Sequence, residues 1–92
     1  MKYLIFEYRY DEDTKQTTPV VFPTFVTHKD MANTLLSTLL NGYRVVSAGF
    51  VVFTPTMRAY GRSDSLNIDS HADDLERILK SDYRIVEDSA SL

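Results

Sequence analysis

Two segments of the chain carry the same signals for the start of a helix, and these signals limit the folds open to it. Thr27-His28-Lys29-Asp30 and Ser70-His71-Ala72-Asp73 each place a hydroxyl side chain three residues before an aspartate, as in a capping box. Apolar residues follow both segments at helical spacing. They are Met31, Ala32, Leu35, Leu36, Leu39 and Leu40 in the first and Ala72, Leu75, Ile78 and Leu79 in the second. We therefore predict two helices, the first ending at Asn41-Gly42.

Extended segments lie before, between and after these helices. Residues 2–10 alternate between two faces and are rich in aromatic side chains, which predicts a first strand. Residues 20–26 continue a strand pattern beside Pro19 and Pro23, so we expect that strand at a sheet edge or with a bulge. Together with residues 2–10 it predicts a long hairpin. Residues 43–53 are nearly all apolar, which is typical of a central strand. Residues 57–60 return after a proline turn, and residues 83–86 predict a last strand.

This order of elements predicts an α+β fold with two layers, in which two helices cover an antiparallel or mixed sheet. From residue 17 the order is β-α-β-β-α-β, the ferredoxin-like arrangement, preceded by an extra N-terminal strand. The similarity of the two halves fits either an internal repeat or shared capping and strand preferences. A length of 92 residues with 43% hydrophobic content suits one domain, residues 1–88, followed by a frayed tail, residues 89–92.

The composition excludes several classes of protein. The chain has no cysteine, so it has no disulfide, no thiolate nucleophile and no zinc site built from cysteine. A net charge of -3 argues against a dedicated binder of the nucleic-acid backbone, which needs a basic footprint. As an alternative, a strand surface that carries Arg9, Arg44, Arg58 and Tyr60 could bind single-stranded nucleic acid.

The sequence gives no sign of membrane insertion or export. Its N-terminal apolar residues meet a charge at Glu7, and no segment approaches the roughly 18 apolar residues of a membrane span. We expect a cytoplasmic protein without a membrane partner.

Five polar residues are candidates for binding a ligand. Gly61-Arg62-Ser63-Asp64-Ser65 could present backbone amides, the Arg62 guanidinium and the hydroxyls of Ser63 and Ser65 to a phosphate, although ordinary turn chemistry explains the same residues. His28 and His71 could act as acid and base or bind a metal, and they also suit tolerant first-turn positions.

Acidic residues gather around the second histidine. Asp64, Asp69, His71, Asp73 and Asp74 could offer oxygen and nitrogen ligands to a divalent ion, but they lack a recognised ligand spacing. Negative charge in a first helical turn explains the last two aspartates. We therefore assign no metal site, no cofactor and no catalytic residue, and the absence of a nucleophile elbow argues against an enzyme.

The tyrosines exceed what a small core requires, and Tyr is favoured at protein interfaces. The candidate interface residues are Tyr3, Tyr8, Tyr10, Tyr43 and Tyr60.

Two further segments stand out in the sequence. They are Val46-Ser47-Ala48-Gly49-Phe50-Val51 and Tyr60-Gly61-Arg62-Ser63-Asp64-Ser65-Leu66, with Asp73-Asp74 after them and Val21-Phe22-Pro23 ahead of His28. Together these segments resemble short uncharacterised proteins of tailed phages and prophages. The resemblance implies no activity. It implies a small accessory protein in the cytoplasm of an infected bacterium, acting on a host or phage protein.

Two functions follow as hypotheses. The first is a non-enzymatic interaction module, self-associating or bound to a protein partner through a strand edge or an uncovered sheet face. The alternative is a small phosphate-ligand or nucleotide binder, or a hydrolase, that uses the loop at Arg62 and a histidine.

Overall fold

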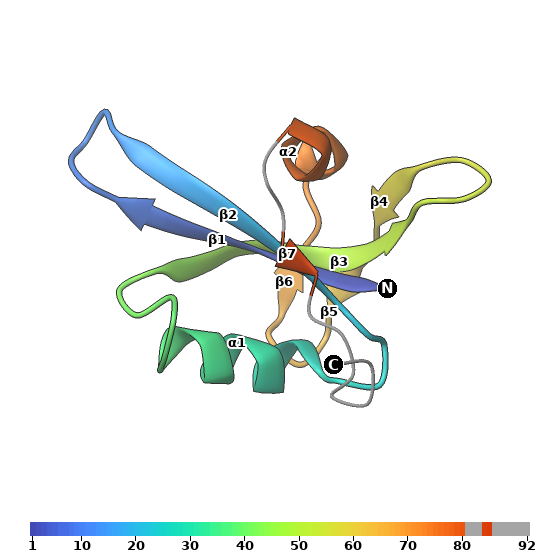
Figure 1. The fold of residues 1–92 in the computed structure, drawn as a ribbon, viewed down its shortest axis with the longest axis horizontal. Helices are drawn as coiled ribbons and strands as arrows, with labels where there is room; N and C mark the ends of the chain where they lie inside the picture. The colour runs from blue at the N-terminus through green and yellow to red at the C-terminus, as the bar shows by residue number, and fades with distance from the viewer. Residues whose placement is uncertain (81–83, 86–92) are drawn as a thin grey trace.

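The computed structural model describes residues 1–80 and 84–85, and its centre is a five-stranded sheet (Figure 1). The strands are β1 (Lys2–Arg9), β2 (Lys15–Phe22), β3 (Arg44–Val52), β4 (Arg58–Tyr60) and β7 (Arg84–Ile85), in the spatial order β4-β3-β1-β2-β7. All neighbours are antiparallel except β2 and β7, which are parallel. The other elements are a small sheet of β5 (Arg62–Ser63) and β6 (Ile68–Asp69), and the helices α1 (His28–Leu36) and α2 (Asp74–Lys80).

The first strand lies in the middle of the sheet and is buried on both sides. Tyr3, Leu4, Ile5 and Phe6 all have no exposed surface. Successive side chains of a strand point to opposite faces, so Leu4 and Phe6 enter one core while Tyr3 and Ile5 enter another. A single strand therefore supplies the centre of two hydrophobic cores.

The two helices pack on opposite faces of this sheet, as Figure 1 shows. Met31 and Ala32 of α1 join the core of Leu4, whereas Ile78 of α2 joins the core of Tyr3. The predicted α+β class with two helices and an antiparallel sheet is confirmed. The predicted two-layer arrangement is wrong, because the central strands are apolar on both faces and each face needs a cover.

The ferredoxin-like arrangement is not confirmed. The N-terminal strand, which we expected as an addition to that core, pairs with β2 on one side and β3 on the other. It therefore lies between β2 and β3, the strands that precede and follow α1 in the chain.

Helix α1 begins where the sequence predicts, but it ends at Leu36, before the predicted end at Asn41-Gly42. The Oγ1 atom of Thr27 accepts a hydrogen bond of 3.0 Å from the backbone N–H of Asp30, which confirms the cap. The hydroxyls of Ser37 and Thr38 donate hydrogen bonds to carbonyl oxygens of the preceding turn. These bonds compete with the backbone hydrogen bonds that would continue the helix. The chain leaves the helix at Leu36 and continues through turns to Gly42.

The predicted β1–β2 hairpin is confirmed, with Pro19 of β2 opposite Ile5. Strand β7 pairs with β2 only at Val20 and Val21, so residues 15–19 form an edge among the described strands. The predicted turn between β3 and β4 contains a cis peptide bond before Pro55. In the described part of the chain, no helix has the length and apolarity needed to cross a membrane. The predicted tail, residues 89–92, lies outside the described residues.

A glycine allows the chain that leaves β4 to pass close to β3. A Cβ atom at Gly49 would collide with the backbone oxygen of Tyr60 and lie 3.2 Å from side-chain atoms of Ser70 and Tyr3. The contact is with backbone, which cannot move aside as a flexible side chain can. Gly49 is therefore required for the close packing of the 60–70 segment on the sheet.

We expect Gly49→Ala to destabilise the protein by about 1–3 kcal/mol, the usual cost of overpacking a core. Urea unfolding followed by circular dichroism measures this loss. An unchanged unfolding midpoint would show that the 60–70 segment can move away from β3 without loss of stability.

Candidate functional site

A buried carboxylate at the start of α2 joins that helix to the sheet. Asp74 has no exposed surface, and its oxygens accept hydrogen bonds from the Tyr3 hydroxyl, from Ser47 Oγ at 2.9 Å and from the backbone N–H of His71 at 2.8 Å. Arg77 Nη1 lies 3.9 Å from the same carboxylate. Hydrogen bonds to an ionised group are stronger than those between neutral groups, so this cluster holds α2 firmly on β1 and β3.

The cluster replaces the helix cap that the sequence predicts. We expected the hydroxyl of Ser70 to cap the helix, but the helix begins at Asp74, and the carboxylate of Asp74 itself satisfies the backbone N–H of His71. Burial raises the pKa of the Tyr3 hydroxyl well above its usual range, and the hydrogen bond to Asp74 raises it further. Tyr3 therefore remains a proton donor to the carboxylate and is no candidate for proton exchange near neutral pH.

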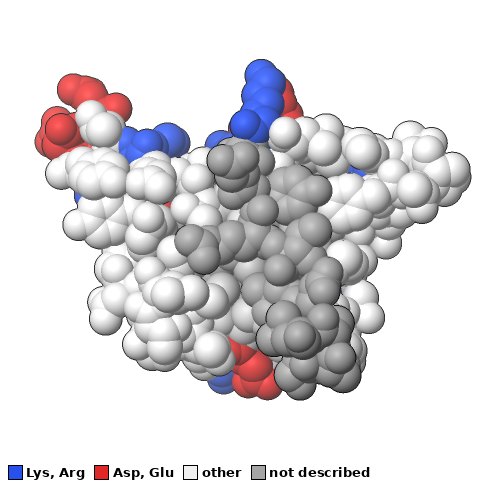
Figure 2. All heavy atoms as spheres, viewed as in Figure 1, with Lys and Arg blue, Asp and Glu red and all other residues white. Residues whose placement is uncertain are grey.

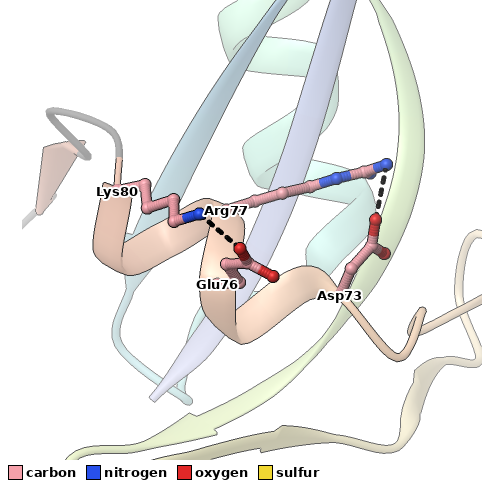
Figure 3. A pocket seen from close by; sticks show the side chains of 4 residues that line it. All are labelled: Asp73, Glu76, Arg77 and Lys80. Carbon is pink, nitrogen blue, oxygen red and sulfur yellow. Dashed lines mark hydrogen bonds and ion pairs between the residues drawn. The ribbon is translucent and has the colours of Figure 1, made fainter.

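The outer side of α2 carries a shallow groove of about 320 Å³, shown in Figure 3. Its four lining residues pair with one another along the helix. Arg77 lies 3.0 Å from Asp73, and Lys80 pairs with Glu76. Two acids and two bases cancel in these pairs, so the groove presents no uncompensated charge to a ligand.

His71, Asp73 and Asp74 bring one ligand atom each within 4.8 Å of one another, a spacing compatible with a metal ion. Asp74 already accepts three hydrogen bonds, and Asp73 pairs with Arg77. A divalent cation would have to compete with these donors for the carboxylate oxygens. The arrangement serves the start of α2, and we assign no metal to it.

The loop predicted to bind phosphate satisfies its own polar groups. Arg62 donates to the Asn67 side chain and lies 3.4 Å from Asp64 and 3.5 Å from Asp69. Ser63 is buried, and its Oγ accepts from the N–H of Leu66 at 3.1 Å. These contacts close the turn between β5 and β6.

Ser65 contacts the start of the other helix. Its hydroxyl accepts a hydrogen bond of 3.2 Å from the backbone N–H of Lys29. The first-turn amide of α1 that could bind an anion thus already has a partner within the protein.

His28 is buried and joins α1 to β3. Its Nε2 atom lies 2.9 Å from the carbonyl oxygen of Gly49 and must therefore carry the proton that it donates. Phe22 and Phe50 meet the ring edge to face, with centroids 5.6 and 5.7 Å away. Burial lowers the pKa of His28, so the ring is neutral at pH 7.

The five predicted ligand residues do not form one pocket. His28 is buried on the α1 side of the sheet, whereas His71 is exposed beside α2. Arg62 and Ser63 belong to the β5–β6 turn, and Ser65 contacts the start of α1. Sequence reasoning missed the residue at the centre of the polar cluster, Asp74, because an exposed first-turn aspartate gives the same local pattern.

The predicted interface tyrosines divide into three groups. Tyr3 is buried, so its side chain does not lie on a surface. Tyr8 stacks edge to face with Tyr10 and lies beside Tyr43, with centroid separations of 4.9 and 5.3 Å. Tyr60 is 44% exposed at the other end of the sheet.

Tyr60 belongs to a group of side chains on the outermost of the described strands, β4, and on its neighbour β3. We call this group, formed by Arg58, Tyr60 and Phe50, the edge ladder. The Arg58 guanidinium lies 4.9 Å from the centroid of the Tyr60 ring, and that ring stacks on Phe50 with centroids 6.0 Å apart. Arg58 and Tyr60 pair opposite Val52 and Phe50, on the α1 side of the sheet.

A second charged group lies on the opposite face, around a nearly buried carboxylate. Glu7 is 6% exposed, and its carboxylate lies 2.9 Å from Arg44, 3.5 Å from Arg9 and 3.7 Å from Lys15. The hydrogen bond from Arg44 lowers the pKa of Glu7, with smaller contributions from the other two cations. Arg9 and Arg44 thus lie on the face opposite Arg58, and the four residues considered for nucleic-acid binding form no single surface.

Comparison with protein-family models, curated proteins and solved structures finds no match to this chain. The resemblance to phage-encoded proteins therefore stays a prediction.

Removal of the buried carboxylate tests its structural role. We expect Asp74→Ala to lower the free energy of unfolding by about 3 kcal/mol, because Tyr3, Ser47 and the His71 amide lose their shared acceptor. Asp73→Ala, at the exposed neighbour, should cost no more than about 1 kcal/mol. Urea unfolding of both variants measures the difference, and equal losses would contradict the special role of Asp74.

The buried histidine predicts a pH dependence of stability. The pKa of His28 is lowered in the folded state, so the unfolded state binds more protons as the pH falls below 6.5. Stability should therefore decline as the pH falls below 6.5, by at most about 1.4 kcal/mol per pH unit. In the more acidic range where carboxyl groups protonate, Glu7 and Asp11, whose pKa values are also lowered, add a separate loss.

The matching variants are His28→Gln and His71→Gln, compared by urea unfolding at several pH values. Gln at position 28 keeps a donor for the Gly49 carbonyl and does not titrate, so the decline that begins below pH 6.5, before the carboxyl groups protonate, should disappear. His71 is exposed, and its replacement should leave the decline in place. The opposite pattern would refute the assignment to His28.

Proposed function

We propose that this chain is a non-enzymatic protein-interaction module that binds an extended segment of its partner at the free edge of β4. The observation that supports this function is the position of β4 at the end of the sheet order. Among the described strands it pairs with β3 alone. An edge strand offers unpaired backbone N–H and C=O groups, and strand addition is a common way of using them.

The side chains at this edge support a selective contact. Tyr60 and Met57 are 44% and 47% exposed, and Arg58 packs over the Tyr60 ring. Tyr and Arg are enriched among residues that dominate binding energy. An added segment would meet an aromatic surface at Tyr60 and a cation at Arg58, which favours an apolar side chain beside an acidic one two residues away.

The biological setting is part of the same proposal. The sequence resemblance to phage and prophage proteins includes Tyr60, which belongs to the edge ladder. The partner would then be a host or phage protein, and the module would act as an accessory factor in the bacterial cytoplasm.

A peptide selection tests this function. Extended peptides chosen from a random library on the immobilised protein should perturb the backbone amide signals of Arg58, Ala59 and Tyr60 in NMR titrations. Tyr60→Ser should weaken their binding about tenfold, which corresponds to about 1.4 kcal/mol.

Tyr10→Ser is the matched control, because Tyr10 is 59% exposed and lies at the other end of the sheet. It should bind the selected peptides with unchanged affinity. Selected peptides that perturb signals elsewhere, or equal losses in both variants, would refute the β4 edge as the binding site.

A further inference from the structure

The outer part of the β1–β2 hairpin, residues 7–17, projects beyond both helices in Figure 1, and we call it the arm. Its free end carries Asp11, Glu12 and Asp13, all exposed, which we call the tip. Behind the tip lie Arg9 and Lys15, which with Arg44 of the neighbouring strand surround Glu7 and form the stem. In Figure 2 the acidic side chains gather at the end of the arm, with basic side chains behind them.

The stem carries an excess of positive charge. Three cations lie within 3.7 Å of the single carboxylate of Glu7, so one negative charge faces three positive charges. Arg9, Lys15 and Arg44 remain 47%, 49% and 68% exposed. No other carboxylate among the described residues pairs with them. Within residues 1–80, two of these positive charges are thus left without a carboxylate of their own on one exposed face.

The tip carries an excess of negative charge that the stem does not neutralise. In the described chain, the side chains of Glu12 and Asp13 form no ion pair. Lys15 lies beside Glu7, and Arg9 lies beside Glu7 and donates a hydrogen bond of 3.1 Å to the backbone oxygen of Glu12. The side chain of Asp11 accepts hydrogen bonds of 2.8 Å from the backbone N–H groups of Asp13 and Thr14, which fix the shape of the turn. The tip is therefore a defined acidic surface.

We propose that the arm is a homodimerisation element, in which two copies lie antiparallel and each acidic tip contacts the basic stem of the other copy. A two-fold axis brings the same patch of both copies together, so such a patch must be complementary to itself. The arm meets this condition, because one short hairpin carries three exposed acids beside a stem of opposite charge. This surface and this partner are distinct from those of the β4 edge.

The charge of the molecule favours a second copy over a long polyanion. The chain has a net charge of -3, and the acids of the tip would repel a nucleic-acid backbone approaching the stem. The tip of another copy carries three acids opposite the three cations of the stem, and its charge does not extend past it. Contacts between exposed charges are screened by salt, so the dimer should be sensitive to ionic strength.

Light scattering on the whole chain, coupled to size exclusion, tests the proposal. The mass should double at an ionic strength of about 10 mM, where the Debye length is about 30 Å, and fall to that of a monomer near 1 M, where it is about 3 Å. Glu12→Lys with Asp13→Lys, the tip variant, should be monomeric throughout. Lys29→Glu with Asp30→Lys reverses two exposed charges at the start of α1 and should dimerise as the wild type does.

Charge-reversal rescue separates a direct contact from a general effect of charge. Arg9→Glu with Lys15→Glu, the stem variant, should be monomeric alone and should form a heterodimer with the tip variant. If the stem variant does not fold, the wild-type salt titration and the tip variant decide the question. Tyr60→Ser should dimerise normally, so failure at the β4 edge and failure at the arm give different results.

Three results would overturn the proposal. A wild-type chain that stays monomeric at low salt contradicts it directly. A dimer that persists in the tip variant places the interface elsewhere. Well-folded tip and stem variants that do not combine show that the two charged groups do not meet.

Discussion

The burial of β1 on both faces is the constraint on which the rest of the structure depends. Four successive side chains from Tyr3 to Phe6 are removed from water, two on each side of the sheet. Full burial of one such side chain contributes roughly 1.5–3 kcal/mol to stability. If either face stayed uncovered, the two side chains on that face would lose their contribution. Both helices are therefore needed, one on each side, and the chain must cross from one face to the other between them.

The crossing explains why the polar cluster of Asp74 exists. Helix α2 has seven residues, and Ile78 is its one fully buried apolar side chain. So short a helix is marginal by itself, so its position must come from tertiary contacts. The hydrogen bonds from Tyr3 and Ser47 to Asp74 supply such contacts from the two central strands. The Tyr3 ring thus packs in the core, and its hydroxyl helps to hold α2 on the sheet.

The sequence predicts local structure better than it predicts which face an element covers. The Thr27 cap, the hairpin and the class of fold follow from patterns within ten residues. The side of the sheet that each helix covers does not, because the segment from Tyr3 to Phe6 is apolar at every position and fits burial on one face or on both. The site is less predictable still. Asp74 and Glu7 lie among partners that are distant in sequence, such as Ser47 and Arg44, and no local pattern shows that these residues meet.

The same contacts determine where binding can occur. His28, Ser63 and Asp74 are polar residues of the kind found in active sites, yet each is buried with a hydrogen-bond partner, and no buried polar side-chain atom among the described residues lacks one. A ligand there would have to replace existing hydrogen bonds at a cost comparable to its own gain. At the β4 edge and on the arm, in contrast, backbone groups and charges meet water. Binding at these two places removes water without breaking the core, which favours the periphery of the sheet for the two proposed interactions.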